Sequence, residues 1–136
     1  MNIGFTGTHK GMTDAQRERV ESLLCLLGGK EFHHGDCIGA DEEAGVIAAL
    51  AGYKVVVHPP EDAKARAFTF GDIMLAPLPY LQRNHEIVDV TDVLIAVPDS
   101  EKNIKRGSGT WATVRYAVKV GKPVRIVLPD GLVQEW

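Results

Sequence analysis

Short apolar runs alternate with longer segments of helical periodicity along the chain, and this alternation is the feature that most restricts the fold. The clearest run is Val93–Val97, which reads Val-Leu-Ile-Ala-Val and is typical of a strand buried on both faces. Repeated strand–helix–strand units with buried strands require a parallel sheet with right-handed crossovers. The sequence therefore predicts an α/β fold.

The other predicted elements fit the same plan. Thr13 and Gln16 form a capping box that should begin the first helix, and the Gly28-Gly29 pair should end it. Further strands are predicted at 2–6, 31–34, 53–58 and 124–128, and further helices at 40–51, 81–90 and 111–120. We therefore expect a Rossmann-like, doubly wound and mainly parallel five-stranded sheet of order 3-2-1-4-5, with helices on both faces.

Residues 61–79 do not follow this alternation. The segment contains Gly71, Pro77 and Pro79 and is too long to be a mere linker in a compact domain. Such connections are usually lids or binding loops. The tail after residue 128 carries no clear pattern, and no element is predicted there.

Composition limits the class of protein. The chain has 136 residues, of which 45% are hydrophobic and 24% charged, so we expect one globular domain over 1–136. The net charge of -3 argues against tight, unspecific nucleic-acid binding, although it leaves room for a local basic groove. Cys25 and Cys37 show no disulfide or zinc-finger spacing, and no run is apolar and long enough to span a bilayer. We therefore expect a cytoplasmic protein that does not bind membranes.

The predicted strand order locates a binding crevice. Ligands of open parallel sheets bind beyond the carboxyl ends of the strands, where the strand order reverses. Here that point lies between the first and fourth strands, so the loops at 7–11 and 100–110 should face each other. In the first loop, Gly7 and Thr8 would present backbone N–H groups to a ligand.

The second of these loops contains a glycine-rich turn that opens the last helix, Arg106-Gly107-Ser108-Gly109-Thr110. Gly107 and Gly109 let a ligand approach the backbone closely, and Ser108 and Thr110 offer hydroxyl groups. The first N–H groups of the helix have no intrahelical partner. This combination predicts an anion site, and phosphate is the anion that such sites most often hold.

Two more loops at this edge carry candidate residues. Gly35 and Gly39 bracket the entry to the second helix, and Asp36 between them could accept hydrogen bonds from ribose hydroxyls. Asp41 near the helix start suits the helix dipole. On the helix at 81–90, the Arg83 guanidinium could hold phosphate through two charge-assisted hydrogen bonds. The adjacent Asn84 could contact a base edge or fix the loop.

Histidines next to these loops suggest a metal, but their geometry argues against one. His33 and His34 are adjacent on a predicted strand, so their side chains should point to opposite faces, away from a common ion with Asp36 and Cys37. We therefore expect no metal and no cofactor. His58, at the end of the third strand, has two interpretations: it contacts a base, or it is structural.

Four motifs in register resemble the SLOG superfamily, the Rossmann-like domains shared by Smf/DprA DNA-processing proteins and LONELY GUY (LOG) proteins. They are Gly-Asp-Cys-Ile-Gly-Ala-Asp at 35–41, Arg-Asn-His-Glu-Ile-Val-Asp at 83–89, the strand Val93–Val97, and the glycine-rich turn before a helix that ends in Gly-Lys-Pro-Val at 121–124. The sequence is most similar to the small stand-alone YspA/YpsA-related type. The resemblance extends from Gly4 to about Val127.

The resemblance implies a pocket for a nucleotide or nucleotide-derived ligand, with phosphate held by the glycine-rich turn and Arg83. LOG proteins are phosphoribohydrolases that cleave the bond between base and ribose 5'-monophosphate. Their pattern places a glutamate three residues after the Gly-Thr pair, where this chain has Thr113. Smf/DprA proteins bind single-stranded DNA instead.

Three functions are therefore open. The first is a binding module for a small phosphorylated nucleoside-type ligand, which catalyses no reaction. The second is an N-glycosidic hydrolase of nucleoside 5'-monophosphates, in which Asp36 or Asp41 replaces the missing glutamate as the catalytic carboxylate. The third is single-stranded nucleic-acid binding through Arg83 and the basic residues Lys102, Lys105 and Arg106. Related domains often dimerise, so a homo-oligomer is an open alternative to a monomer.

Overall fold

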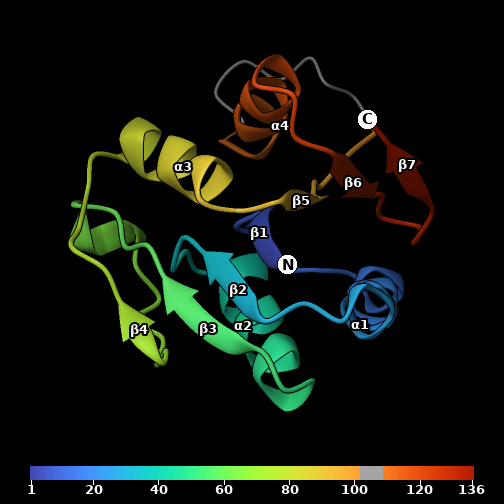
Figure 1. The fold of residues 1–136 in the computed structure, drawn as a ribbon, viewed down its shortest axis with the longest axis horizontal. Helices are drawn as coiled ribbons and strands as arrows, with labels where there is room; N and C mark the ends of the chain where they lie inside the picture. The colour runs from blue at the N-terminus through green and yellow to red at the C-terminus, as the bar shows by residue number, and fades with distance from the viewer. Residues whose placement is uncertain (102–108) are drawn as a thin grey trace.

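A single twisted sheet organises the molecule. The computed structural model describes residues 1–101 and 109–136, and within these ranges the sheet has seven strands. In chain order they are β1 (Asn2–Gly7), β2 (Glu31–His34), β3 (Lys54–Val57), β4 (Ile73–Met74), β5 (Val93–Val97), β6 (Val124–Val127) and β7 (Val133–Glu135). Their spatial order is β4-β3-β2-β1-β5-β6-β7 (Figure 1).

The Rossmann-like α/β class is confirmed, and the five predicted strands occupy the centre of the sheet in the predicted order. All pairings from β4 to β6 are parallel, and only β7 runs antiparallel to its neighbour among the described strands. The sequence predicted five strands, whereas the described sheet has seven, because β4 and β7 are added at its two edges. These strands have two and three residues, which is too short for an alternating apolar pattern to be recognised.

Helices cover both faces of the sheet. The helix α1 (Asp14–Leu27) and the helix α2 (Ala40–Leu50) lie on one face, whereas α3 (Tyr80–Asp89) and α4 (Gly109–Lys119) lie on the other (Figure 1). The segment between β3 and α3 contains a single 3-10 turn, η1 (Ala63–Ala65), in addition to β4. Strand residues alternate between the two faces, so each face has its own apolar core.

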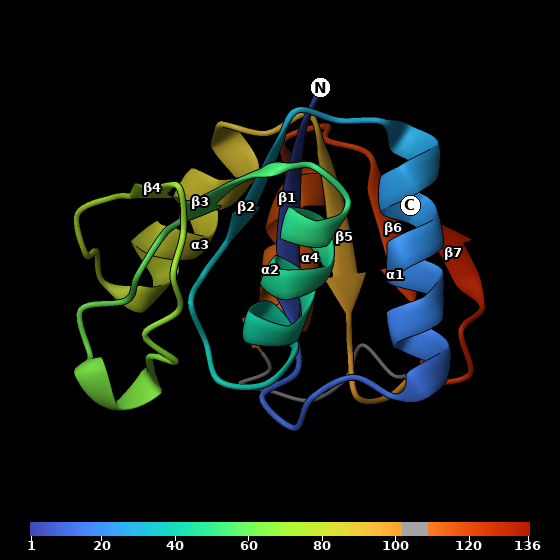
Figure 2. The same cartoon turned by 90° about the horizontal axis from the view of Figure 1, so that it is seen from below.

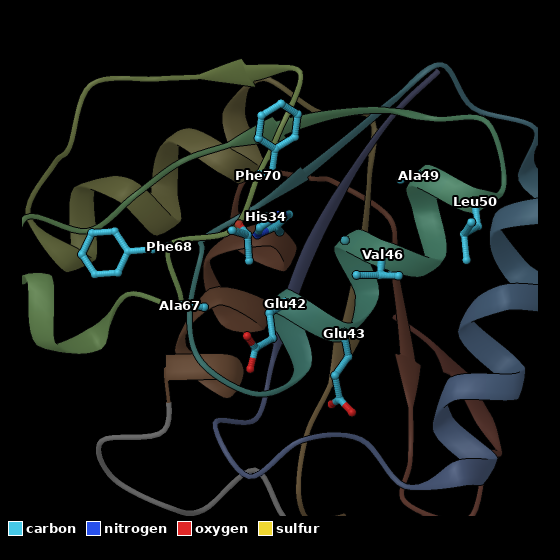
Figure 3. Close-up of a pocket in the computed structure, with 11 residues that line it drawn as sticks. His34, Glu42, Glu43, Val46, Ala49, Leu50, Ala67, Phe68 and Phe70 are labelled. Carbon is cyan, nitrogen blue, oxygen red and sulfur yellow. The ribbon is translucent and has the colours of Figure 1, made fainter.

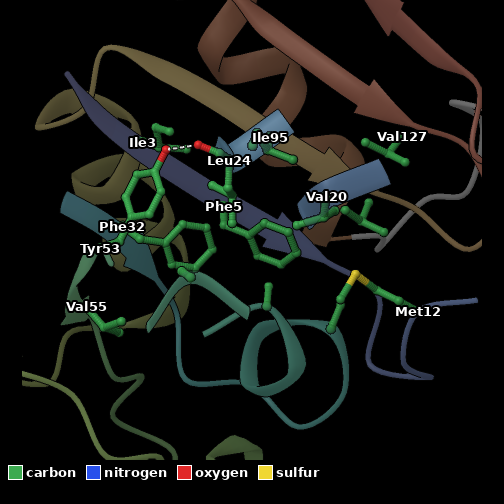
Figure 4. Close-up of a cluster of buried hydrophobic side chains, with 14 of the residues drawn as sticks. Ile3, Phe5, Met12, Val20, Leu24, Phe32, Tyr53, Val55, Ile95 and Val127 are labelled. Carbon is green, nitrogen blue, oxygen red and sulfur yellow. Dashed lines mark hydrogen bonds between the residues drawn. The ribbon is translucent and has the colours of Figure 1, made fainter. Parts of the chain in front are cut away.

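The larger core lies between the sheet and the helices α1 and α2. Strand side chains such as Phe5, Phe32 and Ile95 pack there against Val20 and Leu24 of α1, and all five are fully buried (Figure 4). The second core lies under α4 and includes Leu94, Ala96, Trp111, Val114 and Ile126. The predicted two-face burial of the central strand β5 follows from this arrangement.

The start of α1 is held by the predicted capping box. The Thr13 hydroxyl accepts a hydrogen bond from the backbone N–H of Gln16 at 3.1 Å, and the Gln16 side-chain oxygen accepts one from the Thr13 N–H at 3.0 Å. The Gln16 amide also donates to the carbonyls of Pro98 and Val127 at 2.9 and 3.1 Å. The helix start is thereby attached to the carboxyl ends of β5 and β6.

Replacing Thr13 by alanine should lower the free energy of unfolding by about 1 kcal/mol, because the cap of α1 is lost. The Thr13 hydroxyl also donates to the Pro129 carbonyl at 2.7 Å, which adds to the loss. Urea unfolding of the Thr13→Ala protein measures the effect. The control is Ser22→Ala, an exposed hydroxyl within the same helix, which should be nearly neutral. Equal effects of the two substitutions would contradict the capping role.

Candidate functional site

The reversal of strand order lies at β1, as expected. This strand pairs with β2 on one side and β5 on the other, and both pairings are parallel, so the loops after β1 and β5 leave from the same edge (Figure 2). Two interactions join these loops. The Thr8 N–H donates to the Val97 carbonyl at 3.0 Å, and Lys10 Nζ lies 3.1 Å from a carboxylate oxygen of Asp99.

The loop after β1 supports the beginning of α2. The Ala40 N–H donates to the Thr8 carbonyl at 3.0 Å. A Cβ on Gly39, which has a φ of 99°, would lie 2.5 Å from the His9 carbonyl oxygen, and one on Gly7 would lie 2.5 Å from the Cβ of Ala40. The structure thus brings Gly7, Thr8 and Gly39 together. Glycine is needed at 7 and 39 so that helix and loop can touch, and contact with a ligand stays a prediction.

The beginnings of α3 and α4 also meet at this edge. A Cβ on Gly109 would overlap the Tyr80 hydroxyl, so the first residues of the two helices are in direct contact. The Thr110 side chain is buried, and the Thr113 hydroxyl donates to the Gly109 carbonyl at 2.8 Å. The position at which LOG proteins carry glutamate is therefore a structural threonine.

The glycine-rich turn is described only at its last two residues. Gly107 and Ser108 lie outside the described residues, as do Lys102, Lys105 and Arg106. Their roles remain predictions from the sequence.

The Arg83 side chain lies inside the protein. It is 2% exposed, and its Nη1 donates to the carbonyls of Gly35 and His58, the latter at 3.2 Å. Its Nε donates to the Asn84 amide oxygen at 2.8 Å, and Nη2 lies 3.5 Å from Cys37 Sγ. The guanidinium therefore joins the ends of β2 and β3. The sequence suggested that this guanidinium holds phosphate, but α3 presents it on the buried face of the helix, where its hydrogen bonds go to protein groups. Phosphate binding by Arg83 stays a prediction.

Asp41 closes the loop between β2 and α2. One of its carboxylate oxygens accepts hydrogen bonds from the N–H groups of Gly35 and Cys37, at 3.0 and 3.2 Å. Burial raises the pKa of Asp41 to about 6, although the Arg83 charge and the two N–H groups act in the opposite direction. Asp41 thus has a loop-closing role in addition to the helix-dipole interaction that the sequence suggested.

The Asp36 carboxylate faces the 61–79 segment. Asp36 is fully buried with a φ of 57°, and its side chain accepts hydrogen bonds from Arg66 Nε at 2.8 Å and from the N–H and hydroxyl of Thr69 at 2.8 and 2.6 Å. Burial disfavours the charge, but the bonds from Thr69 and Arg66 prevail and lower the pKa of Asp36. Ribose binding and catalysis by Asp36 or Asp41 remain predictions, and in this structure both carboxylates are engaged by protein groups.

The three histidines near this edge are hydrogen-bonded in different directions. His33 Nδ1 lies 2.7 Å from His58 Nε2, and the outer nitrogens of this pair contact Glu31 at 2.9 Å and Glu86 at 2.7 Å. His34 points to the opposite face, as predicted, where its Nδ1 accepts from the Asp36 N–H at 3.0 Å. Within residues 1–101 and 109–136, no group of three metal-ligating side chains converges.

Tyr80 also lies at this edge, although the sequence pattern predicted no role for it. Tyr80 contacts the start of α4, and its ring lies 4.8 Å from the Arg83 guanidinium carbon. An aromatic residue directly after Pro79, at the start of a helix that carries the candidate arginine, was the signal that could have identified it.

Comparisons with known proteins support the fold. No protein-family model matches the chain, and no curated protein matches it. Among solved structures, the molybdenum cofactor binding protein from the phototrophic bacterium Rippkaea orientalis is similar with a TM-score of 0.71 and 25% identity, covering 93% of this chain and 76% of that one. The Moco carrier protein from Chlamydomonas reinhardtii gives a TM-score of 0.67 and 26% identity, covering 95% and 75%.

These likenesses support the Rossmann-like fold and are compatible with a SLOG-type domain, whereas the subtype stays a prediction. In the described part of the chain, every helix is too short or too polar to cross a lipid bilayer.

Replacing Asp36 by asparagine should release the 61–79 segment, because an amide cannot accept from both Thr69 and Arg66 as a carboxylate does. We expect a loss of about 1–3 kcal/mol in unfolding free energy and faster hydrogen exchange at the Thr69 amide. Asp62→Asn is the matched control, since Asp62 caps η1 in the same segment and is exposed. Unchanged exchange at Thr69 in the Asp36→Asn protein would disprove the anchoring role.

The buried Asp41 predicts a distinct pH dependence. Its pKa is raised to about 6 in the folded chain, so its contribution to stability is full below its unfolded pKa of about 4 and falls as pH rises through 6. The expected loss is on the order of 2–3 kcal/mol. His34, whose pKa burial lowers to about 4, contributes with the opposite sign over the same pH range, so the Asp41 contribution is read from the difference between two proteins. In urea unfolding at pH 4, 5, 6 and 7, the stability of the native chain should fall relative to that of Asp41→Asn as the pH rises. Identical slopes in the two proteins would refute the assignment.

Proposed function

We propose that this chain binds a small phosphorylated ligand in the crevice at the carboxyl edge of the sheet, between β1 and β5. The observation that carries the proposal is the reversal of strand order at β1, with the starts of α2 and α4 at the same edge. Helix starts present N–H groups that have no intrahelical partner, and they favour anions. The hydroxyl-bearing residues Thr8 and Thr110 lie at this edge.

The ligand that fits these features is a phosphorylated, nucleotide-like heterocycle. The sequence resemblance favours a nucleotide or a nucleotide-derived molecule. Two similar solved structures are a molybdenum cofactor binding protein and a Moco carrier protein. The molybdenum cofactor is a pterin that carries a phosphate ester, so it shares the flat heterocycle and the phosphate with a nucleotide. It is therefore a candidate cargo for this chain beside the nucleotides.

The start of α4 would bind the phosphate of this ligand, and residues around it would support the site. The phosphate would lie on the first amides of α4, next to Thr110 and the turn that contains Gly107 and Ser108. The backbone at Gly7 and Thr8 would line the opposite side. Arg83 would act from beneath the site by fixing the carbonyls of Gly35 and His58, and its buried positive charge would favour an anion nearby.

Binding is favoured over N-glycosidic hydrolysis. Hydrolysis needs a carboxylate that can approach the ribose as the base departs. Asp36 and Asp41 both accept hydrogen bonds from the protein, and Thr113 holds the position of the expected glutamate. Single-stranded DNA binding has less support as well, because Arg83 is buried.

Thermal unfolding in the presence of ligands tests the proposal. AMP, GMP, ADP-ribose and molybdenum cofactor released from a molybdoenzyme would be compared with adenosine and guanosine. A phosphorylated ligand at 100 times its Kd should add about 2.7 kcal/mol of stability and raise Tm, whereas the nucleosides should have little effect.

Two substitutions of Thr110 test whether its hydroxyl group contributes to binding. Thr110→Val keeps the volume but removes the hydroxyl, and it should weaken binding by roughly tenfold. Thr110→Ser keeps the hydroxyl and should bind like the native chain. The absence of any Tm rise with phosphorylated ligands, or equal binding by the valine variant, would refute the proposed function.

A further inference from the structure

A groove runs along the outer face of α2, apart from the crevice. It lies between this helix and residues 67–70, and its volume is about 640 Å³, within the range of small-molecule sites (Figure 3). Val46 and Leu50 of α2 line one side, and Phe70 lies across from them with His34 between (Figure 3). Residues 67–70 belong to the segment 61–79, which the sequence predicted to be a lid or binding loop.

His34 has a hydrogen-bond donor that the protein does not use. The ring is fully buried at the end of β2, and its Nδ1 accepts from the Asp36 N–H at 3.0 Å. Burial lowers the pKa of His34 to about 4, so at neutral pH the ring is neutral and carries its proton on Nε2. Among the described residues, nothing accepts a hydrogen bond from this Nε2–H. A buried donor without an acceptor is rare and calls for a partner.

Gly45 lets the His34 ring approach the backbone of α2 closely. A Cβ at position 45 would lie 3.0 Å from His34 Nε2 and 3.3 Å from Cδ2, and would cover the nitrogen. Glycine inside a helix is unfavourable relative to alanine. The close approach of the His34 ring to α2 explains why glycine stands at position 45. The Nε2 atom is covered from bulk water, and an incoming ligand must part the groove walls slightly to reach it.

The walls of the groove are apolar and solvent-exposed. Phe70 is 96% exposed, Leu50 85% and Val46 62%, which places three large apolar side chains in water around one groove. The backbone next to Phe70 is firmly held, because Thr69 makes two hydrogen bonds to the buried Asp36 carboxylate. An aromatic wall on a fixed support suits the stacking of a flat ring.

The acidic side chains at one end of the groove disfavour an anionic ligand. Glu42 and Glu43 lie at the end of the groove near the start of α2, and Arg17 pairs with Glu43. Neither lysine nor arginine is found among the described residues that line the groove. A phosphate would meet the Glu42 carboxylate without a cation in the lining to offset it. The groove therefore differs from the proposed phosphate crevice in the charge that it accepts.

We propose that this groove is a second ligand site, which binds a neutral, flat heterocycle. The ligand directs a ring nitrogen or ring carbonyl oxygen at the Nε2–H of His34 and lays its ring against Phe70. The groove is separate from the proposed phosphate crevice, since Thr8 and Thr110 are not among its lining residues.

Two probes of equal shape test the donor. Isoquinoline has a ring nitrogen that can accept from His34, and naphthalene is the same bicycle without it. In protein labelled with ¹⁵N-histidine, isoquinoline should shift the Nε2 resonance of His34 and bind about tenfold more tightly than naphthalene. Equal affinities with no Nε2 shift would overturn the proposal.

Gly45→Ala is the decisive variant. Alanine favours the helix, and the His34 ring needs to shift by only a few tenths of an ångström to admit the methyl group, so the variant should fold with its donor blocked. A far-UV circular dichroism spectrum and a Tm like those of the native chain check that it does. We expect isoquinoline binding to weaken at least about tenfold, with the phosphate-dependent Tm rise of the crevice unchanged. Phe70→Ala should also weaken the probe, whereas Leu26→Ala, an exposed apolar change on α1, should not. Native-like isoquinoline binding by Gly45→Ala would refute the site.

A second copy of the chain is the competing occupant. Sedimentation that shows a concentration-dependent dimer, lost in Leu50→Asp, together with no isoquinoline binding by the native chain, would assign the groove to self-association and overturn the proposal.

Discussion

The buried guanidinium of Arg83 is the constraint on which the candidate-site region depends. A charge that is 2% exposed must be surrounded by hydrogen-bond acceptors, because an unpaired buried charge is strongly destabilising. The carbonyls of Gly35 and His58 provide acceptors, so the end of β2 and the end of β3 are drawn to one side chain of α3. The charge also lies close to Asp41, whose carboxylate holds the N–H groups of the same loop. The loop between β2 and α2 is thus fixed from both sides.

The shape of that loop determines what its next residues can reach. Asp36 has a φ of 57°, an uncommon conformation for a residue other than glycine, and its side chain is directed toward the 61–79 segment. Thr69 and Arg66 donate hydrogen bonds to this carboxylate, so the 61–79 segment, for which the sequence predicted no helix or strand, is attached to the loop after β2. The Asp36 N–H meanwhile fixes the tautomer of His34. One loop therefore contributes to both the crevice and the groove.

Local patterns in the sequence predicted the fold well, and long-range contacts explain what they missed. The capping box of Thr13 and Gln16 is formed by residues three apart, and it is present as predicted. The partner of Asp36 is 33 residues away at Thr69, and no local pattern indicates such a pair. Arg83 belongs to a polar stretch that resembles a solvent-exposed helix end, yet α3 packs its Arg83 and Asn84 face inward. The edge of the sheet at which these residues lie was therefore easier to predict than the direction of their side chains.

The two proposed sites share α2 but should select ligands of opposite character. The proposed crevice lies where helices start, and the positive end of the helix dipole favours an anion there. The groove lies along the side of α2, where the backbone groups are paired within the helix and contribute no such field. Its polarity comes from side chains, namely the Glu42 carboxylate and the neutral Nε2–H of His34. A molecule that carries both a phosphate and a heterocycle would thus favour the crevice, and a neutral heterocycle without phosphate would favour the groove.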